Sequence, residues 1–111
     1  MLRSSVLNAG ENSANGDQVV FSPSAGTTAL LKSAYVDAVA GSPAGTASLY
    51  VSRPSGGSGH LLPLGPITGG ESFSWEGWVV LEPGDEVHLV ANTADCAYWL
   101  SGALLQGVVE Q

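Results

Sequence analysis

Positive charge is scarce in this sequence. Its 111 residues include three cations, Arg3, Lys32 and Arg53, against ten Asp and Glu residues, so the formal net charge is −7. Binding to a phosphate backbone requires clustered Lys and Arg, and an anionic membrane surface makes the same demand. The composition therefore argues against nucleic acid and against a membrane as partners.

Cysteine and long apolar runs are also scarce. Cys96 is the single cysteine, so no internal disulfide can form, although small extracellular domains often depend on one. No apolar run approaches the roughly 18–20 residues that a transmembrane helix needs, and the segment after Met1 lacks the apolar core of a secretory signal. Charged residues are only 12% of the chain and hydrophobic residues are 44%. This balance favours one compact, acidic domain over a disordered chain.

Short runs of alternating apolar and polar residues fill the chain from Gln18 onward, each bounded by Gly, Pro, Asn or Ser. This pattern is typical of β-strands. A helix is the alternative for residues 27–39, but Thr27, Thr28 and the flanking glycines favour a strand. About seven or eight strands at roughly ten-residue spacing predict an all-β fold, an antiparallel β-sandwich of jelly-roll type. The runs predicted as strands are 18–21, 27–39, 46–52, 60–64, 72–81, 86–91 and 97–105.

The two ends of the chain differ in composition. Residues 1–17 are rich in Ser, Asn and Gly and have no sustained period, so we expect a flexible N-terminal arm, either a disordered terminus or an arm that orders against a neighbouring subunit. Residues 18–111 are then the β-sandwich domain. Residues 53–59 predict a flexible Gly/Ser-rich loop. Pro63 predicts an edge or bulged strand because proline cannot donate to a ladder.

Turn chemistry accounts for several polar residues. The sequence Glu82-Pro83-Gly84-Asp85 fits a type II turn that the Asp85 side chain caps. The carboxylates of this acidic turn, including Glu86, are expected to be solvated, with a weak cation site between subunits as the alternative.

Residues suited to catalysis or metal binding do not form a recognisable set. His60, His88 and Cys96 lack the spacing of zinc ligands, and a cupin-type enzyme would need a histidine-rich strand that is missing. His88 is expected on a solvated outward face, and Cys96 as a small, partly buried hydrophobe. Ser58 precedes His60 closely, but a Gly-rich loop cannot hold a catalytic geometry. We therefore expect no enzyme activity, no cofactor and no metal.

Aromatic residues supply the candidate binding residues. Trp75 falls on the core-facing row of residues 72–81, whereas Trp78 and Val80 fall on the opposite row. An outward Trp indicates either local cover by loops or a contact with another molecule. The interface candidates are Trp78, Trp99, Tyr50 and Val80. The alternative is that Trp78, Trp99, Tyr50 or Tyr98 stacks on the sugar rings of a glycan.

Residues 27–36, 47–53, 75–87 and 98–103 together carry a resemblance to a known group of proteins. Over about residues 18–109, their order of strands and turns resembles that of small β-sandwich structural proteins of tailed bacteriophage virions. The resemblance implies a non-enzymatic protein present in many copies, a capsid decoration protein in the first place or a neck or tail accessory protein. It implies contacts with further copies of the chain and with other virion proteins such as the major capsid protein. It also implies a virion location after assembly in the host cytoplasm.

Overall fold

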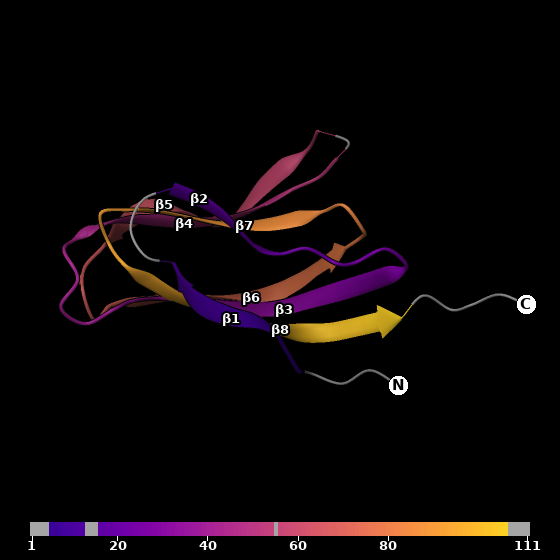
Figure 1. Ribbon diagram of the computed structural model, residues 1–111, viewed down its shortest axis with the longest axis horizontal. Helices are drawn as coiled ribbons and strands as arrows, with labels where there is room; N and C mark the ends of the chain where they lie inside the picture. Colours follow the sequence, from indigo (N-terminus) through magenta and orange to yellow (C-terminus); the bar gives the residue numbers. More distant parts are fainter. Residues whose placement is uncertain (1–4, 13–15, 55, 107–111) are drawn as a thin grey trace, which may run out of the picture.

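The computed structural model describes residues 5–12, 16–54 and 56–106, and every regular element within them is a β-strand (Figure 1). The strands pair in an antiparallel manner into two four-stranded sheets, a first sheet of order β1-β8-β3-β6 and a second of order β2-β7-β4-β5. This is a jelly roll, so the predicted antiparallel β-sandwich is confirmed. The strands are β1 (Ser5–Asn12), β2 (Gly16–Phe21), β3 (Thr27–Ala38), β4 (Gly45–Ser52), β5 (Ser58–Ile67), β6 (Ser72–Leu81), β7 (Glu86–Asn92) and β8 (Cys96–Gln106).

The core lies between the facing sheets, which form two layers in Figure 1. Alternate residues of each strand point inward because side chains along a strand change face at every residue. Leu31 and Leu100 of the first sheet and Leu49 and Leu89 of the second are fully buried in one apolar cluster. Phe73, on the edge strand β6, packs against this cluster and is only half-buried.

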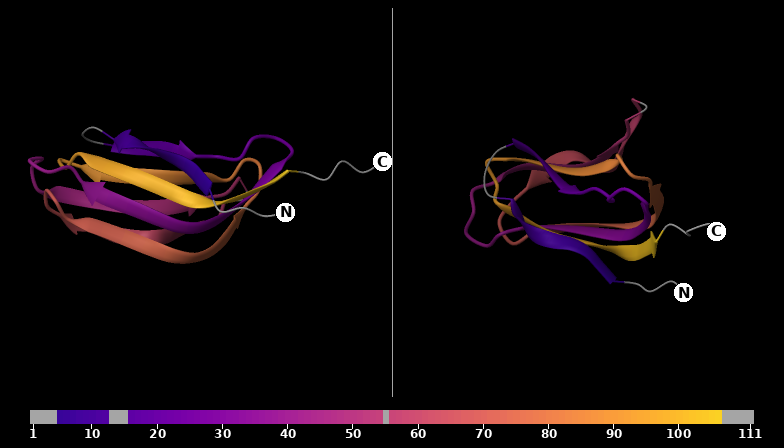
Figure 2. Two further views of the ribbon diagram at one scale, coloured as in Figure 1. Left: turned by 90° about the horizontal axis from the view of Figure 1, so that it is seen from below. Right: turned by 45° about the vertical axis from the view of Figure 1, so that its right-hand side comes forward.

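The N-terminal segment differs from the sequence-based expectation of an arm over residues 1–17. Residues 5–12 form β1, which pairs with β8 along its whole length, and β2 begins at Gly16 (Figure 2, left). The first sheet therefore extends into the range expected for the arm. β1 shows little alternation of apolar and polar residues because it is an edge strand, and its described contact with the core comes from Leu7. Backbone pairing with β8 holds the other residues of the strand in place.

Both irregular features predicted in the second half of the sandwich are present. β5, which contains Pro63, is an edge strand with register shifts against β4. Gly84 has a φ of 96°, which a type II turn requires at that position. The Gly/Ser-rich loop is shorter than expected because Ser58 and Gly59 already belong to β5, and the β4–β5 hairpin projects from the sandwich (Figures 1 and 2).

Candidate functional site

The outer face of the first sheet carries a row of apolar side chains. Leu30 lies at the centre of this row, with Ala103 as its register partner on β8 and Val80 as its partner on β6. Leu30 is only 6% exposed although it lies outside the core cluster. The neighbouring side chains of the same face therefore cover it, which explains why residues 27–39 appear apolar on both sides.

Two indoles lie on this outer face. Trp78 is 76% exposed, on β6, and Trp99 is 52% exposed, on β8. Tyr35, the register partner of Trp99 on β3, is also exposed. Tyr35 is not among the predicted interface residues, because its position beside Trp99 follows only from the register of β3 and β8. We call the set Trp78, Val80, Tyr35, Trp99 and Leu105 the aromatic face.

Tyr50, the fourth interface candidate, lies on the other side of the molecule. It projects from β4 on the outer face of the second sheet, and its ring stacks on that of His88 with centroids 4.5 Å apart. Its hydroxyl donates a hydrogen bond to Asp17 Oδ2 at 2.6 Å. The structure thus brings Trp78, Val80 and Trp99 to one face and places Tyr50 on the opposite one.

His88 belongs to a polar cluster and is not the solvated residue that the sequence indicated. Its side chain is 12% exposed, with Nδ1 at 2.6 Å from Asp17 Oδ1 and Nε2 at 3.1 Å from Glu86 Oε1. Ser52 Oγ is also 3.0 Å from Nε2. The prediction failed because the pairing of β2 with β7, which brings Asp17 to His88, cannot be read from the local sequence pattern.

The same cluster shifts two ionisation equilibria. Burial raises the pKa of the Asp17 carboxyl, but the hydrogen bonds from Tyr50 and His88 and the charge interaction with His88 outweigh it, so the pKa of Asp17 lies below its ordinary value. The pKa of Tyr50 is raised, chiefly because its hydroxyl donates to the Asp17 carboxylate. The cluster therefore favours an ionised Asp17 beside a neutral Tyr50.

Asp85 is buried, which corrects the expectation of a solvated acidic turn. It is 3% exposed, and its Oδ2 accepts hydrogen bonds from Arg53 Nη1 at 2.6 Å and from the Glu82 backbone N–H at 2.8 Å. The second of these bonds is the predicted cap of the turn. The first joins the end of β4 to the β6–β7 turn, and Arg53 Nη2 also donates to the Val80 carbonyl at 3.2 Å.

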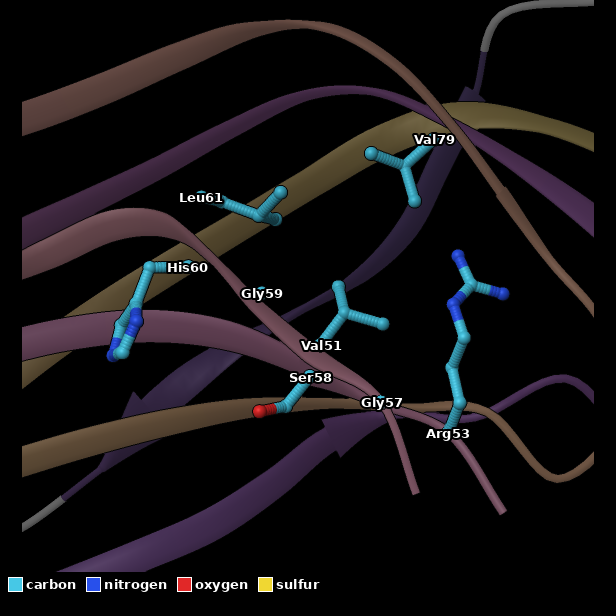
Figure 3. Close-up of a pocket in the computed structure, with 8 residues that line it drawn as sticks. All are labelled: Val51, Arg53, Gly57, Ser58, Gly59, His60, Leu61 and Val79. Atoms are coloured by element: carbon cyan, nitrogen blue, oxygen red, sulfur yellow. The ribbon is translucent and has the colours of Figure 1, made fainter. Parts of the chain in front are cut away.

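The described residues do not assemble a metal-binding set. Among them no group of three or more His, Cys, Asp and Glu side chains could hold a metal ion. Cys96 is fully buried, and burial raises the pKa of its thiol. Ser58 and His60 line an open hollow beside Val79, and Figure 3 shows their side chains directed away from its interior. Over the same residues, no helix has the length and apolarity to cross a membrane.

Comparison with known proteins finds likeness in structure alone. No family model matches the chain, and no curated protein matches it in sequence. A structure of Bacillus endospore appendages, described as disulfide-linked pili, superposes with a TM-score of 0.56 and 12% identity over 96% of this chain and 89% of that one. A structure of infectious bursal disease virus, Gx strain, gives a TM-score of 0.52 with 10% identity over 96% of this chain.

These likenesses establish the fold. The chain spans about a third of the viral chain, with 32% of that chain covered. The xylan-binding CBM22-1 domain of Paenibacillus barcinonensis Xyn10C is similar over 96% of this chain at 16% identity, but its TM-score is 0.36. At 10–12% identity the first two likenesses show the fold alone, so function has to be inferred from the surfaces of this chain.

Proposed function

We propose that this protein is a non-enzymatic structural subunit of a virus particle, which works by adhesion through the aromatic face. The observation that carries the proposal is the exposure of Trp78, Trp99 and Val80 together on one outer face of the sandwich. In finer terms, we propose a capsid decoration protein of a tailed bacteriophage, present in many copies and assembled in the host cytoplasm. A neck or tail accessory protein is the alternative within the same class.

The aromatic face has the composition of a contact surface. Trp and Tyr are enriched where proteins bind one another, because a large ring loses much water-exposed area for little side-chain entropy. Within the face, Ser33, Ser101 and Glu76 are in register between the Tyr35–Trp99 pair and the Leu30–Val80 pair. A narrow polar band therefore separates the two apolar parts of the aromatic face. An outer sheet face of a monomer would ordinarily be polar, and this one is covered most simply by another protein.

The structural neighbours support the proposal in general terms. One is a structure of a virus, and the other is of endospore appendages described as pili. Disulfide linkage, described for the appendages, does not transfer to this chain, because Cys96 is buried in the core. Contacts between copies would be non-covalent, and a stable one would bury about 800 Å² on each partner.

The proposal is tested with particles made with and without this protein and with purified variants. Trp78→Ala and Trp99→Ala should each lower occupancy on the particle about tenfold or more, as loss of a central aromatic contact does, while the thermal unfolding midpoint stays near that of the wild type. Leu64→Ala is the matched control, since Leu64 is exposed on β5 and outside the aromatic face. Unchanged occupancy in both Trp variants would contradict the assignment of this face.

A glycan is the second candidate ligand. Tyr35 and Trp99 are cross-strand neighbours that both expose their rings, and adjacent exposed rings are suited to stacking on sugars. Tyr98 is excluded from this role because it is buried. A glycan array combined with intrinsic Trp fluorescence decides between the candidates: a quench that disappears in Trp99→Ala favours the sugar, and no response favours the protein contact.

A further inference from the structure

The four edge strands of the sandwich are not equally protected. β5 carries Pro63 and Pro66 and has irregular pairing with β4, and β1 has a register shift between Val6 and Asn8. Prolines, bulges and short length are the usual means by which an edge avoids pairing with another chain. β2 is also short, with six residues. β6 is longer than β1 and β2, and unlike β5 it contains no proline. Glu76 is its one charged residue, and its pairing with β3 shifts register opposite Leu31 and Ser33.

The core-facing row of β6 is incompletely covered. Phe73, Trp75 and Val79 pack against the core yet remain only half-buried, because no strand lies beyond them in the sheet. Two hollows lie at this side of the sandwich. One, of about 370 Å³, is lined by Val79 together with the β4–β5 hairpin (Figure 3); the other, of about 450 Å³, is lined by Phe73 and part of β5.

We propose that β6 pairs with β6 of a second copy of this chain, antiparallel and about a two-fold axis, so that the two first sheets become one continuous eight-stranded sheet. The proposal rests on the proposed function, because it names one contact by which copies of the subunit associate. It also places the two aromatic faces side by side on one surface of the joined sheet.

The sequence of β6 selects one register. Opposed residues in an antiparallel pair share a face, so the axis must pass through a residue and not between two. An axis at Glu76 would set two like charges directly opposite, which is destabilising. An axis at Gly77 gives the longest overlap, residues 73–81, without that clash. Ser74 then opposes Val80 of the second copy on the outer face, and Trp75 opposes Val79 of the second copy on the core-facing side.

The hydrogen-bonding groups of β6 fit this register. The Val80 carbonyl accepts a bond from Arg53, so it is accessible from the free side of the strand. Exposure alternates without interruption from Ser72 to Val80, across the register shift against β3. Ser74 and Val80 therefore share a face, and their backbone groups point to the same edge of the strand. In the pair, the Ser74 backbone N–H of the second copy takes the place of the Arg53 donor, and Arg53 keeps its bond to Asp85.

A cysteine cross-link tests both the pairing and its register. The double variant Ser74→Cys/Val80→Cys should form a disulfide-linked dimer under mild oxidation, since Cα atoms of hydrogen-bonded partners lie about 5.5 Å apart and disulfides span roughly 4.4–6.8 Å. Both positions are exposed, so the variant should fold. The expected result is a shift to dimer mass on a non-reducing gel that reductant reverses, while buried Cys96 does not react.

The matched control is Ser72→Cys/Val80→Cys, which would be cross-linked only in the register centred on Glu76. In the proposed register its cysteines are offset by two residues, roughly 7 Å along the strand, and it should stay monomeric on the gel. Cross-linking of the control in place of the test variant overturns the register. If neither variant forms a cross-link, the pairing is overturned. The assignment of the aromatic face is tested separately, by particle occupancy in the Trp78→Ala and Trp99→Ala variants.

Discussion

Arg53 is the residue on which the joint between β4 and the β6–β7 turn depends. Its guanidinium contacts the Asp85 carboxylate at 2.6 Å, and the Asp85 side chain is only 5% exposed. A carboxylate withdrawn from water in this way depends on the donors that remain to it. Apart from Arg53, the donor that reaches Asp85 Oδ2 is the Glu82 backbone N–H.

Arg53→Met should therefore destabilise the fold by about 1–3 kcal/mol, because, among the described residues, it leaves the buried carboxylate with the Glu82 backbone N–H as its donor. The substitution preserves the aliphatic stem. Urea unfolding at pH 7 measures the loss. Lys32→Met removes a charge of the same sign from an exposed position of β3 and should leave the urea midpoint nearly unchanged. Equal midpoints for the two variants would contradict the importance of the Arg53–Asp85 pair.

Asp17 gives a pH-dependent prediction. Its pKa is lowered in the folded state, so its contribution to stability is present above the unfolded-state value of about 3.9 and is lost as the pH falls through the folded-state value. The difference in thermal midpoint between wild type and Asp17→Asn should be largest above about pH 5 and should shrink steadily as the pH is lowered below about 4. A difference that grows on acidification would reverse the sign and refute the assignment. In Tyr50→Phe, which lacks the hydroxyl donor, the pKa of Asp17 should move back toward its ordinary value in an NMR titration.

At the scale of the strand, the backbone of β3 lies close to Gly102 of β8. Gly102 opposes Leu31 where the register of β3 shifts between Leu31 and Ser33. The Leu30 carbonyl oxygen occupies the place that a Cβ atom at position 102 would take. The strand irregularity therefore depends on the lack of a side chain at this position.

Gly102→Ala should cost about 1–3 kcal/mol, the range found when atoms are added to a filled site. Gly59 of β5 is the control, because a Cβ there would meet open space, so Gly59→Ala should change stability by less than about 0.5 kcal/mol. Denaturant unfolding of both variants checks the contrast. A neutral Gly102→Ala would show that the backbones of β3 and β8 separate easily.

Strand positions could be predicted from the sequence, whereas partners across strands could not. The alternation of residues 72–81 correctly separated Trp75 from Trp78, because period-two patterning depends only on local backbone geometry. His88 and Asp85 were misplaced since Asp17 and Arg53, which contact them, come from distant parts of the chain. The register that joins such residues depends on the whole sheet, and β1 was missed for the same reason, since its stability comes from pairing with β8.

At the scale of the whole molecule, the two outer faces differ in chemistry. The first sheet presents the aromatic face, and the second presents the polar cluster of Asp17, Tyr50, His88 and Glu86. This asymmetry gives the molecule one side with exposed aromatic residues and one polar side, which is the arrangement that the proposed capsid decoration role would use. The outer face of the second sheet is the more polar of the two because Asp17, Tyr50, His88 and Glu86 interact there across neighbouring strands.

The register shift of β1 between Val6 and Asn8 has a consequence for the size of the assembly. A sheet joined at β6 would end at a β1 strand on each margin, and β1, which is irregular and two residues shorter than β6, is a poorer template for further strands. Growth of this sheet by strand addition would thus terminate after two copies, which gives a dimer and not an open-ended fibre.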